Sequence, residues 1–224
     1  MSAHIWPEWE HVLSAAAHLQ VVLPGATLVG DTAAAIFAGH RVSHDADHVL
    51  TDLRDRFDEV LAQLESVAGW RTARVKRPVL ILGSLDGIET GVRQLIREQP
   101  LETREVHIGG VGLVVPTDSE MLRIKAVLIL KRNATRDYLD FVALAERAGP
   151  DGVLAALVNL DELYPQPGGE SALQQLQVQL AHPVPYDLDE TNLTEYRKLD
   201  PKWQDWQRVS RTCATVAVDI FRRL

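Results

Sequence analysis

Apolar and polar positions divide the chain into a first part with both helical and strand patterns and a second part that is almost entirely helical. In the first part, residues 53–68 keep the 3.6-residue helical period most clearly, and Gly69 is a natural stop for that helix. Short apolar runs are typical of strands. The expected elements up to that point are helices over residues 7–19, 32–38 and 53–68 and strands over residues 26–29 and 45–50.

Residues 70–115 predict two to four further strands, because they are rich in Val, Ile and Leu and are broken by glycines. Beyond Pro116 the pattern is helical, beginning with a capping box formed by Thr117 and Glu120. The expected helices cover residues 117–131, 134–147, 151–160 and 170–181, with a last one from near Pro201. This layout indicates an α+β fold with a mixed sheet in residues 1–115 and a helical C-terminal part in residues 116–224.

Composition favours an ordinary globular protein of the cytoplasm. The chain is 46% hydrophobic and 24% charged, and no apolar run approaches the roughly 20 residues that span a bilayer. The N-terminus lacks a basic segment followed by an apolar one, so no membrane partner is expected. Cys213 is the single cysteine, which excludes an intrachain disulfide and a thiolate zinc site.

The formal net charge of −8 argues against a protein that coats nucleic acid, because phosphate binding depends on accumulated Lys and Arg. Local basic clusters could still hold a triphosphate or the end of an RNA, or could be solvated basic faces. One cluster consists of Arg71, Arg74, Lys76 and Arg77, and the other of Lys125, Lys131, Arg132 and Arg136.

The candidate chemistry begins at Gly30, which follows an apolar strand and would let backbone N–H groups approach a phosphate. Asp45 and Asp47 stand at i and i+2 on the next predicted strand, so their carboxylates point the same way and can grip one hard divalent cation. An Asp-x-Asp pair alone is weakly specific. Its position after a strand-ending glycine, with Arg41 and Ser43 before it, makes it more specific.

These residues resemble the first motif of the AbiEii/AbiGii toxin family of nucleotidyltransferases, Gly-Gly-Thr followed by Arg-x-Ser-x-Asp-x-Asp. A second motif of that family, a lysine helix followed by Arg-Asp-x-x-Asp, resembles residues 115–125 and 131–140. The resemblance covers residues 26–147. It implies a DNA polymerase β-like core, Mg²⁺ (or Mn²⁺) as cofactor, and transfer of a nucleotidyl group from an NTP to a hydroxyl of tRNA or of a protein. It also implies the toxin of a bacterial toxin–antitoxin pair, with a cognate antitoxin as partner.

By the same resemblance each matching residue acquires an expected role. Asp45 and Asp47 would bind the metal, Lys125 would contact the nucleotide phosphates, and Asp137 would lie near the acceptor hydroxyl or orient Lys125. The expected nucleotide-binding residues are Gly30, Asp31, Thr32, Arg41, Ser43, Lys125, Arg132 and Arg136. Helical spacing agrees with this grouping, because Lys125 and Arg132 share one helix face.

A third metal-binding carboxylate would come from Glu89 or Asp86. Asp86 and Gly87 form a strong two-residue hairpin signal, so a turn is the simpler interpretation of Asp86. Glu89 lies inside the following predicted strand, where an acid that faces a metal makes more sense. Glu89 is therefore the preferred third acid, with Asp86 as the alternative.

Asp31 departs from the family pattern, which has a small residue there. A carboxylate beside the phosphate cradle would repel a triphosphate unless it faces away, binds metal or caps the helix that follows. Asp31 therefore favours the alternative interpretation, a catalytically inactive protein that keeps the nucleotidyltransferase fold and only binds.

The sequence disfavours two other kinds of enzyme, a histidine-ligated metalloenzyme and an enzyme with a Cys or Ser nucleophile. His40, His44 and His48 are spaced by four, but two such histidines share one metal only on a helix, which Gly39, Val42 and Ser43 disfavour. A nucleophilic enzyme is disfavoured because Cys213 lies on an apolar helical stripe and Ser84 lacks the Gly-x-Ser-x-Gly elbow.

Overall fold

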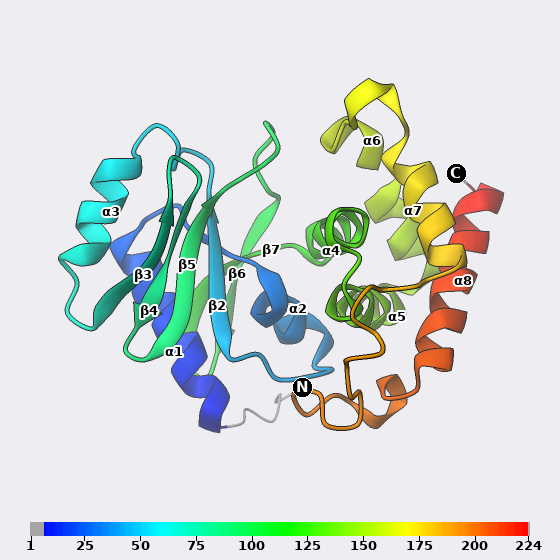
Figure 1. The fold of residues 1–224 in the computed structure, drawn as a ribbon, viewed down its shortest axis with the longest axis horizontal. Helices are drawn as coiled ribbons and strands as arrows, with labels where there is room; N and C mark the ends of the chain where they lie inside the picture. Colours follow the sequence, from blue (N-terminus) through cyan, green and yellow to red (C-terminus); the bar gives the residue numbers. More distant parts are fainter. Residues whose placement is uncertain (1–6, 224) are drawn as a thin grey trace. The chain divides into compact units, whose positions relative to one another are not determined.

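The computed structural model describes residues 7–223 and divides the chain into two compact units (Figure 1). Unit 1 comprises residues up to Ile36 together with Val42–Thr117, and unit 2 comprises Phe37–Arg41 and the chain from Asp118 onward. The sequence places the division at residues 115 and 116. The units divide two residues later, and unit 2 also takes Phe37–Arg41, which end the helix α2 (Gly30–Ala38) and begin the loop after it.

Unit 1 is built on a mixed five-stranded sheet in the order β1-β2-β5-β4-β3. β2 and β5 are parallel, and the other neighbours in this sheet are antiparallel. A separate antiparallel pair, β6 and β7, packs against α1 and β1. The strands are β1 (Thr27–Leu28), β2 (Asp45–Leu50), β3 (Trp70–Lys76), β4 (Leu80–Leu85), β5 (Ile88–Gln94), β6 (Thr103–Ile108) and β7 (Val111–Pro116).

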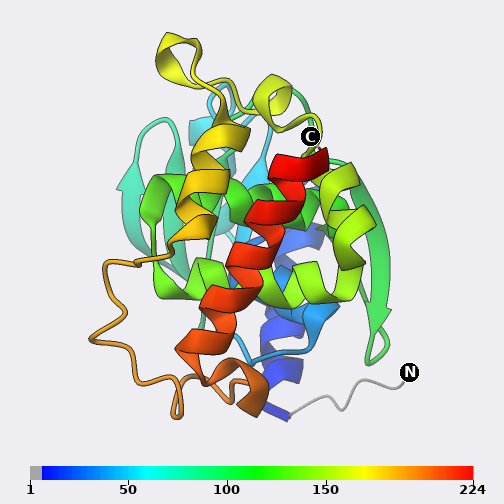
Figure 2. The same ribbon diagram turned by 90° about the vertical axis from the view of Figure 1, so that its right-hand side faces the viewer.

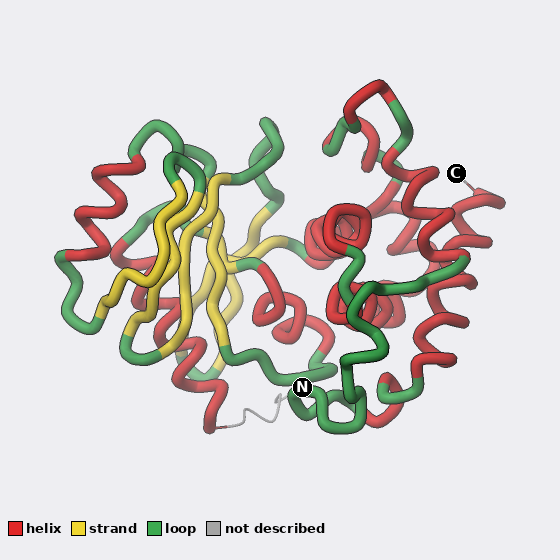
Figure 3. The backbone as a smooth tube through the Cα atoms, viewed as in Figure 1, coloured by secondary structure: helices red, strands yellow, loops and turns green. Residues whose placement is uncertain are grey.

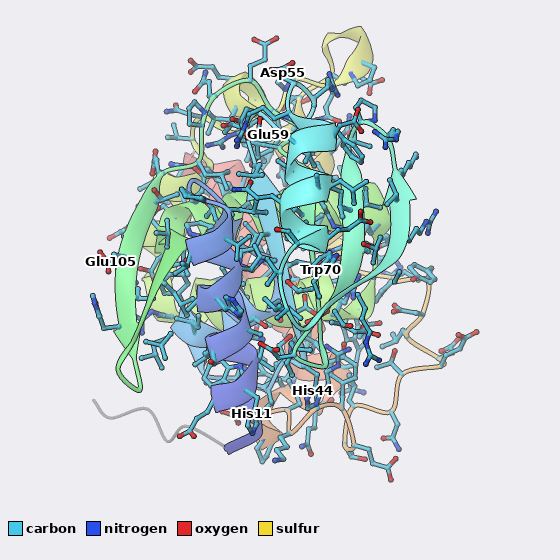
Figure 4. The ribbon with its side chains drawn as sticks, turned by 90° about the vertical axis from the view of Figure 1, so that its left-hand side faces the viewer. His11, His44, Asp55, Glu59, Trp70 and Glu105 are labelled. Atoms are coloured by element: carbon cyan, nitrogen blue, oxygen red, sulfur yellow. The ribbon has the colours of Figure 1, made fainter. Side chains whose placement is uncertain are left out.

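Helices cover one face of this sheet. α1 (Pro7–Val22) and α3 (Phe57–Glu65) lie on the side that faces the viewer in Figure 4, where Glu59 marks α3 and Trp70 marks the start of β3. The hydrophobic core of unit 1 lies beneath them and includes Leu19, Leu50, Leu64, Ile81 and Val92. Alternate residues of β2 are buried on this face, so its remaining residues point to the opposite face.

Unit 2 consists of helices and loops, whereas all the described strands belong to unit 1 (Figure 3). α8 packs against α5 and α7, and α4 packs against α5 and α7 (Figure 2). The helices are α4 (Asp118–Arg132), α5 (Thr135–Leu157), α6 (Leu160–Leu163), α7 (Ala172–Ala181) and α8 (Trp206–Arg223), with single turns at Pro167–Gly169 and Pro201–Trp203. No helix within residues 7–223 is long and apolar enough to cross a membrane.

The expected α+β class with a mixed sheet is confirmed, and β2 has the expected bounds. The expected number of strands after residue 70 is wrong, because five form rather than two to four. The expected helix over residues 53–68 is shorter, since residues 51–56 form turns and α3 begins at Phe57. The two helices expected over residues 134–147 and 151–160 form within α5, which the non-helical Gly149 (φ 70°) interrupts before Pro150, and the second helix ends at Leu157.

Candidate functional site

Three acidic side chains share one face of the sheet in unit 1. Asp45 and Asp47 alternate along β2 with the buried Ala46 and His48, so both point away from the core. The parallel register pairs Asp45 with Glu89 on β5 and Asp47 with Gly91. Residues in register on neighbouring strands point to the same face, so Glu89 stands beside Asp45 at one inter-strand spacing, about 4.8 Å.

Neighbouring groups hold Asp45 in place. The Ser43 hydroxyl donates to its carboxylate at 2.6 Å, and the Thr32 hydroxyl donates to its backbone carbonyl at 2.5 Å. Thr32 and Ser43, both expected to bind nucleotide, thus act here on the metal-binding candidate itself. A guanidinium nitrogen of Arg93 lies 3.9 Å from the Asp47 carboxylate, on the same face as the acids.

Gly30 links the end of β1 to the first turn of α2 (Gly30–Ala38) and lies beside Asp47. Its φ of +72° is a backbone conformation that favours glycine, and a Cβ at this position would lie 3.4 Å from the Cβ of Asp47. The N–H groups at a helix N-terminus attract anions. The start of α2 is therefore next to the acids, where a nucleotide's phosphates would need donors.

Asp31 lies in the first turn of α2 and is mostly buried. The helix begins at Gly30, so Asp31 is inside the first turn rather than at the capping position expected from the sequence. A carboxylate there interacts favourably with the positive end of the helix dipole. It also takes up part of the positive potential that a phosphate would otherwise use.

The structure separates the two candidates for a third acid. Asp86 occupies the β4–β5 turn with a φ of +53°, and its exposed carboxylate lies 3.4 Å from His18. Glu89 is on β5, in register with Asp45. The geometry therefore favours Glu89 over Asp86.

Carboxylate oxygens on one face suit a hard cation such as Mg²⁺, which keeps several waters and takes only one or two carboxylates from the protein. Within residues 7–223 no three His, Cys, Asp or Glu side chains already converge closely enough to enclose a metal ion. Asp45 and Asp47 are the acids of this face that could hold such an ion.

Unit 2 contains a buried ionic cluster centred on Asp140 of α5. The Asp140 carboxylate accepts hydrogen bonds from Arg41 Nε at 2.7 Å, from Arg41 Nη2 at 2.9 Å and from His40 Nε2 at 2.7 Å. The Nζ of Lys125 on α4 lies 2.5 Å from the same carboxylate. The side chains of Arg41, Lys125 and Asp140 are fully buried, so this cluster ties residues 40 and 41 to α4 and α5.

The cluster shifts the protonation of its members. Burial alone would raise the pKa of Asp140, but the charges of Arg41 and Lys125 and the contact with His40 outweigh burial and hold that pKa well below its usual range. Burial lowers the pKa of His40, against the opposing effect of Asp140. Asp140 is therefore ionised.

Asp137 extends the cluster toward the surface. Its carboxylate lies 3.6 Å from Lys125 Nζ and accepts two hydrogen bonds from Arg132, at 2.9 and 3.1 Å. Of the two roles implied for Asp137, this contact favours orienting Lys125. Arg132 keeps 38% of its side chain exposed, whereas Lys125, expected to contact phosphates, is fully buried. Arg136 is partly buried on α5.

The histidine metal site is not formed by this structure. His48 is buried on the opposite face of β2 from Asp45, and its Nδ1 lies 3.0 Å from the carbonyl of Ala46. His40 is held by Asp140, and His44 is exposed. His44 precedes β2 and His48 lies within it, so the two do not share the helix that such a site would need.

Asp140 and His40 are the prominent residues of this region that sequence reasoning did not include in the site. Asp140 was visible as the last acid of the Arg-Asp-x-x-Asp segment, three positions after Asp137. Its partners Arg41 and His40 lie about a hundred residues earlier, so only the fold shows that Asp140 is the centre of the cluster. Cys213 is buried, as expected, and burial raises the pKa of its thiol to about 12.

Known structures place this chain among proteins with the nucleotidyltransferase fold. It is similar to a protein from H. pylori assigned as a nucleotidyltransferase, with a TM-score of 0.51 and 15% identity over 98% of this chain and 97% of that one. It is also similar to ANT(2″)-Ia, solved in complex with adenylyl-2″-tobramycin, with a TM-score of 0.50 and 14% identity over 69% of this chain and 96% of that one. No protein-family model matches the chain.

Curated relatives share a shorter segment. The chain is 35% identical over 125 residues to the heme uptake protein MmpL11 of Mycobacterium tuberculosis and to the probable transport protein MmpL11 of Mycobacterium bovis. It is 31% identical over 125 residues to the mycolic acid-containing lipids exporter MmpL11 of Mycolicibacterium smegmatis. These matches cover 54% of this chain but only 12 to 13% of the relatives.

Proposed function

We propose that this chain is a nucleotidyltransferase that moves a nucleotidyl group from an NTP to a hydroxyl of an RNA such as tRNA, or of a protein. The observation that carries the proposal is the register of β2 and β5, which gathers Asp45, Asp47 and Glu89 on one face beside the start of α2. The nucleotidyltransferase fold supports it.

In this reaction the acceptor oxygen forms a bond to the α-phosphorus, the bond between the α- and β-phosphates breaks, and pyrophosphate leaves with the acceptor's proton lost to solvent or base. Asp45 and Asp47, with Glu89 beside them, would hold Mg²⁺ (or Mn²⁺). When bound, the ion supplies charge that polarises the α-phosphate and stabilises the leaving pyrophosphate. Ser43 and Thr32 keep Asp45 oriented, and the N–H groups of α2 offer donors to the phosphates.

The cations of unit 2 that the resemblance assigns to the nucleotide differ in their exposure. Arg132 is the member of the Asp137 cluster that a phosphate can reach from solvent, and Arg136 follows it on the next helix. Lys125 is buried between Asp140 and Asp137, so its contribution is to hold these acids and their partners in place. Arg41, paired with Asp140, acts in the same way.

The biological role that we propose is that of a growth-inhibiting toxin of the cytoplasm, counteracted by a cognate antitoxin. It rests on the resemblance of residues 26–147 to the AbiEii/AbiGii toxin family. Induction of the chain in a bacterial host should arrest growth if this role is correct. Growth at the uninduced rate, with folded protein in the cells, would contradict it.

Asp31 favours a second function, a catalytically inactive protein that uses the same fold to bind. Its mostly buried carboxylate stands in the first turn of α2, where it would repel a phosphate. If Asp31 prevents phosphate binding, the wild type should transfer no label and should bind Mg-NTP more weakly than Asp31→Gly does. Transfer by the wild type would contradict this second function.

The transfer assay is the direct test of the proposed reaction. The chain is incubated with Mg²⁺, one α-labelled NTP at a time, and either total tRNA or cell extract. We expect label to enter one acceptor with at least one NTP, and the variant Asp45→Ala, Asp47→Ala to lower the rate by about 1000-fold, equivalent to about 4 kcal/mol of lost transition-state stabilisation.

The matched control is Asp55→Ala, Asp189→Ala, which removes the same charge from two exposed positions. It should transfer label at the wild-type rate. No transfer with any NTP, or transfer that survives the loss of Asp45 and Asp47 in a folded protein, would overturn the proposal.

A further inference from the structure

β3 is the free edge of the five-stranded sheet and carries a row of cations. Its residues after Trp70 are exposed, and Arg71, Arg74 and Lys76 alternate along it except for a bulge between Thr72 and Arg74. These three residues are called the β3 basic stripe below. Within the described chain none of them forms a side-chain hydrogen bond or an ion pair, whereas the neighbouring Arg77 pairs with Asp58.

Strand register places this stripe on the same face of the sheet as the candidate metal-binding acids. The row of Asp45 and Glu89 continues through Ser84 to Arg71. The row of Asp47 continues through Gly91 and Leu82 to Arg74, and Lys76 ends the row of Arg93 and Leu80. Because of the bulge between Thr72 and Arg74, Arg74 and Lys76 stay on the same face as Arg71. Thr72 lies on the opposite face, where its hydroxyl donates to Glu65 of α3.

The separation of the two features determines what the stripe can contact. β3 lies three inter-strand spacings from β2, about 14 Å. The backbone of the stripe is therefore well separated from the strand that would hold the reacting phosphate. A ligand that contacts both the acids and the stripe must be long enough to extend from β2 to the sheet edge.

The length and charge of the stripe fit a nucleic-acid strand. From Arg71 to Lys76 the chain rises about 16 Å, with cations on one side spaced by about 6.7 Å where they alternate directly, which is comparable to the spacing of successive phosphates. Arg binds phosphate oxygens in a bidentate manner. The chain carries a net charge of −8, so a local cluster of unpaired cations is the kind of feature through which it could attract a polyanion.

We propose that the β3 basic stripe binds the phosphate backbone of a nucleic-acid acceptor whose terminal hydroxyl reacts at Asp45 and Asp47. The inference rests on the proposed nucleotidyl transfer and assigns a nucleic acid, rather than a protein, as the acceptor. The stripe positions the acceptor strand and takes no part in bond making.

The test measures binding of a fluorescently labelled 12-nucleotide single-stranded RNA by anisotropy at several salt concentrations. Each phosphate contact on a single strand contributes about 0.7 to the slope of log K against log salt. We expect Arg74→Gln, Lys76→Gln to lower that slope by about 1.4 and to weaken binding roughly tenfold at low salt. Arg54→Gln, Arg222→Gln removes two other exposed cations and should bind RNA as the wild type does.

Two further arms separate the possible outcomes. Asp45→Asn, Asp47→Asn should keep RNA binding, so failure of the transfer reaction alone leaves this result standing. A polyglutamate peptide of equal charge should compete weakly. Unchanged binding by the Arg74, Lys76 variant, an equal loss in the Arg54, Arg222 variant, or equal competition by polyglutamate would each overturn the proposal.

Cross-linking of the unaltered protein avoids dependence on how the variants fold. An oligonucleotide containing 4-thiouridine is cross-linked by ultraviolet light, and the attached peptide is identified by mass spectrometry. We expect a cross-link within residues 70–77. Cross-links found only in other segments would contradict the assignment.

Discussion

Glu89 stands one strand away from Asp45 on the same face of the sheet, whereas Asp86 occupies a turn with a left-handed backbone. Sequence reasoning favoured Glu89 from its place inside a predicted strand. The register adds a second reason for proposing Glu89, since it places Glu89 beside Asp45 on the neighbouring strand.

Glu89→Gln should lower the rate of nucleotidyl transfer by roughly 100-fold, as loss of a metal-supporting acid typically does. Asp86→Asn should change it by less than about threefold, because asparagine tolerates the left-handed turn and the carboxylate faces solvent. The rates are compared at saturating Mg²⁺ and NTP. A larger effect at Asp86 than at Glu89 would show that the assignment of the third acid is reversed.

Asp140 is the residue whose loss should most affect stability. Asp140→Asn removes the buried carboxylate that Arg41 and Lys125 share, and breaking such a buried ion pair costs about 3–5 kcal/mol. Urea unfolding followed by circular dichroism measures the loss of free energy of unfolding. The exposed Asp189→Asn should stay within about 0.5 kcal/mol of wild type. A loss at Asp140 as small as that at Asp189 would mean that the buried cluster does not stabilise unit 2.

At the scale of elements, β2 has two chemically different faces. Asp45 and Asp47 point to one face, and the buried Ala46, His48 and Leu50 point to the other. Polar and apolar residues alternate along this strand, so both the strand and its ends at Asp45 and Leu50 could be predicted from the sequence. The β6–β7 pair adds strands beyond the expected number. In strand β7, the Val114 N–H donates to the Gln20 side-chain oxygen, and the Gln20 side-chain NH₂ of α1 donates to the Val114 carbonyl. These residues are far apart in sequence, so a local pattern could not predict the contact.

His48 gives β2 a pH-dependent stability. Burial lowers its pKa to about 4, whereas an unfolded histidine titrates near 6.5. Between these values the unfolded chain binds a proton that the folded chain does not, so the free energy of unfolding falls as the pH drops from about 6.5 to 4. His48 should account for about 2 kcal/mol of loss between pH 7 and pH 5.

The variant His48→Leu removes this titration and keeps an apolar side chain in the core. Its free energy of unfolding, measured in urea, should therefore decline less than that of wild type between pH 7 and pH 5. An identical decline in both proteins would show that the pKa of His48 does not differ between the folded and unfolded chain.

In the whole molecule, the strand-rich sequence ends at Pro116, and the sheet-bearing unit ends one residue later, at Thr117. Local spacing also indicated Gly30, Asp45 and Asp47, because these residues lie close in sequence. The buried cluster could not be predicted, since Arg41 and Asp140 are 99 positions apart and meet only through the fold. The assignment of Phe37–Arg41 to unit 2 depends on the same long-range contacts.

Calorimetric titration measures whether Asp45 and Asp47 bind a metal–nucleotide complex. Mg²⁺ with a non-hydrolysable analogue of ATP, GTP, CTP or UTP is titrated into the wild type, into Asp45→Asn, Asp47→Asn, and into the control Asp55→Asn, Asp189→Asn. We expect at least one analogue to bind the wild type and the control with one-to-one stoichiometry, and the first variant to bind at least about 100-fold more weakly. No binding of any analogue to the wild type, or equal binding to all three proteins, would contradict the account.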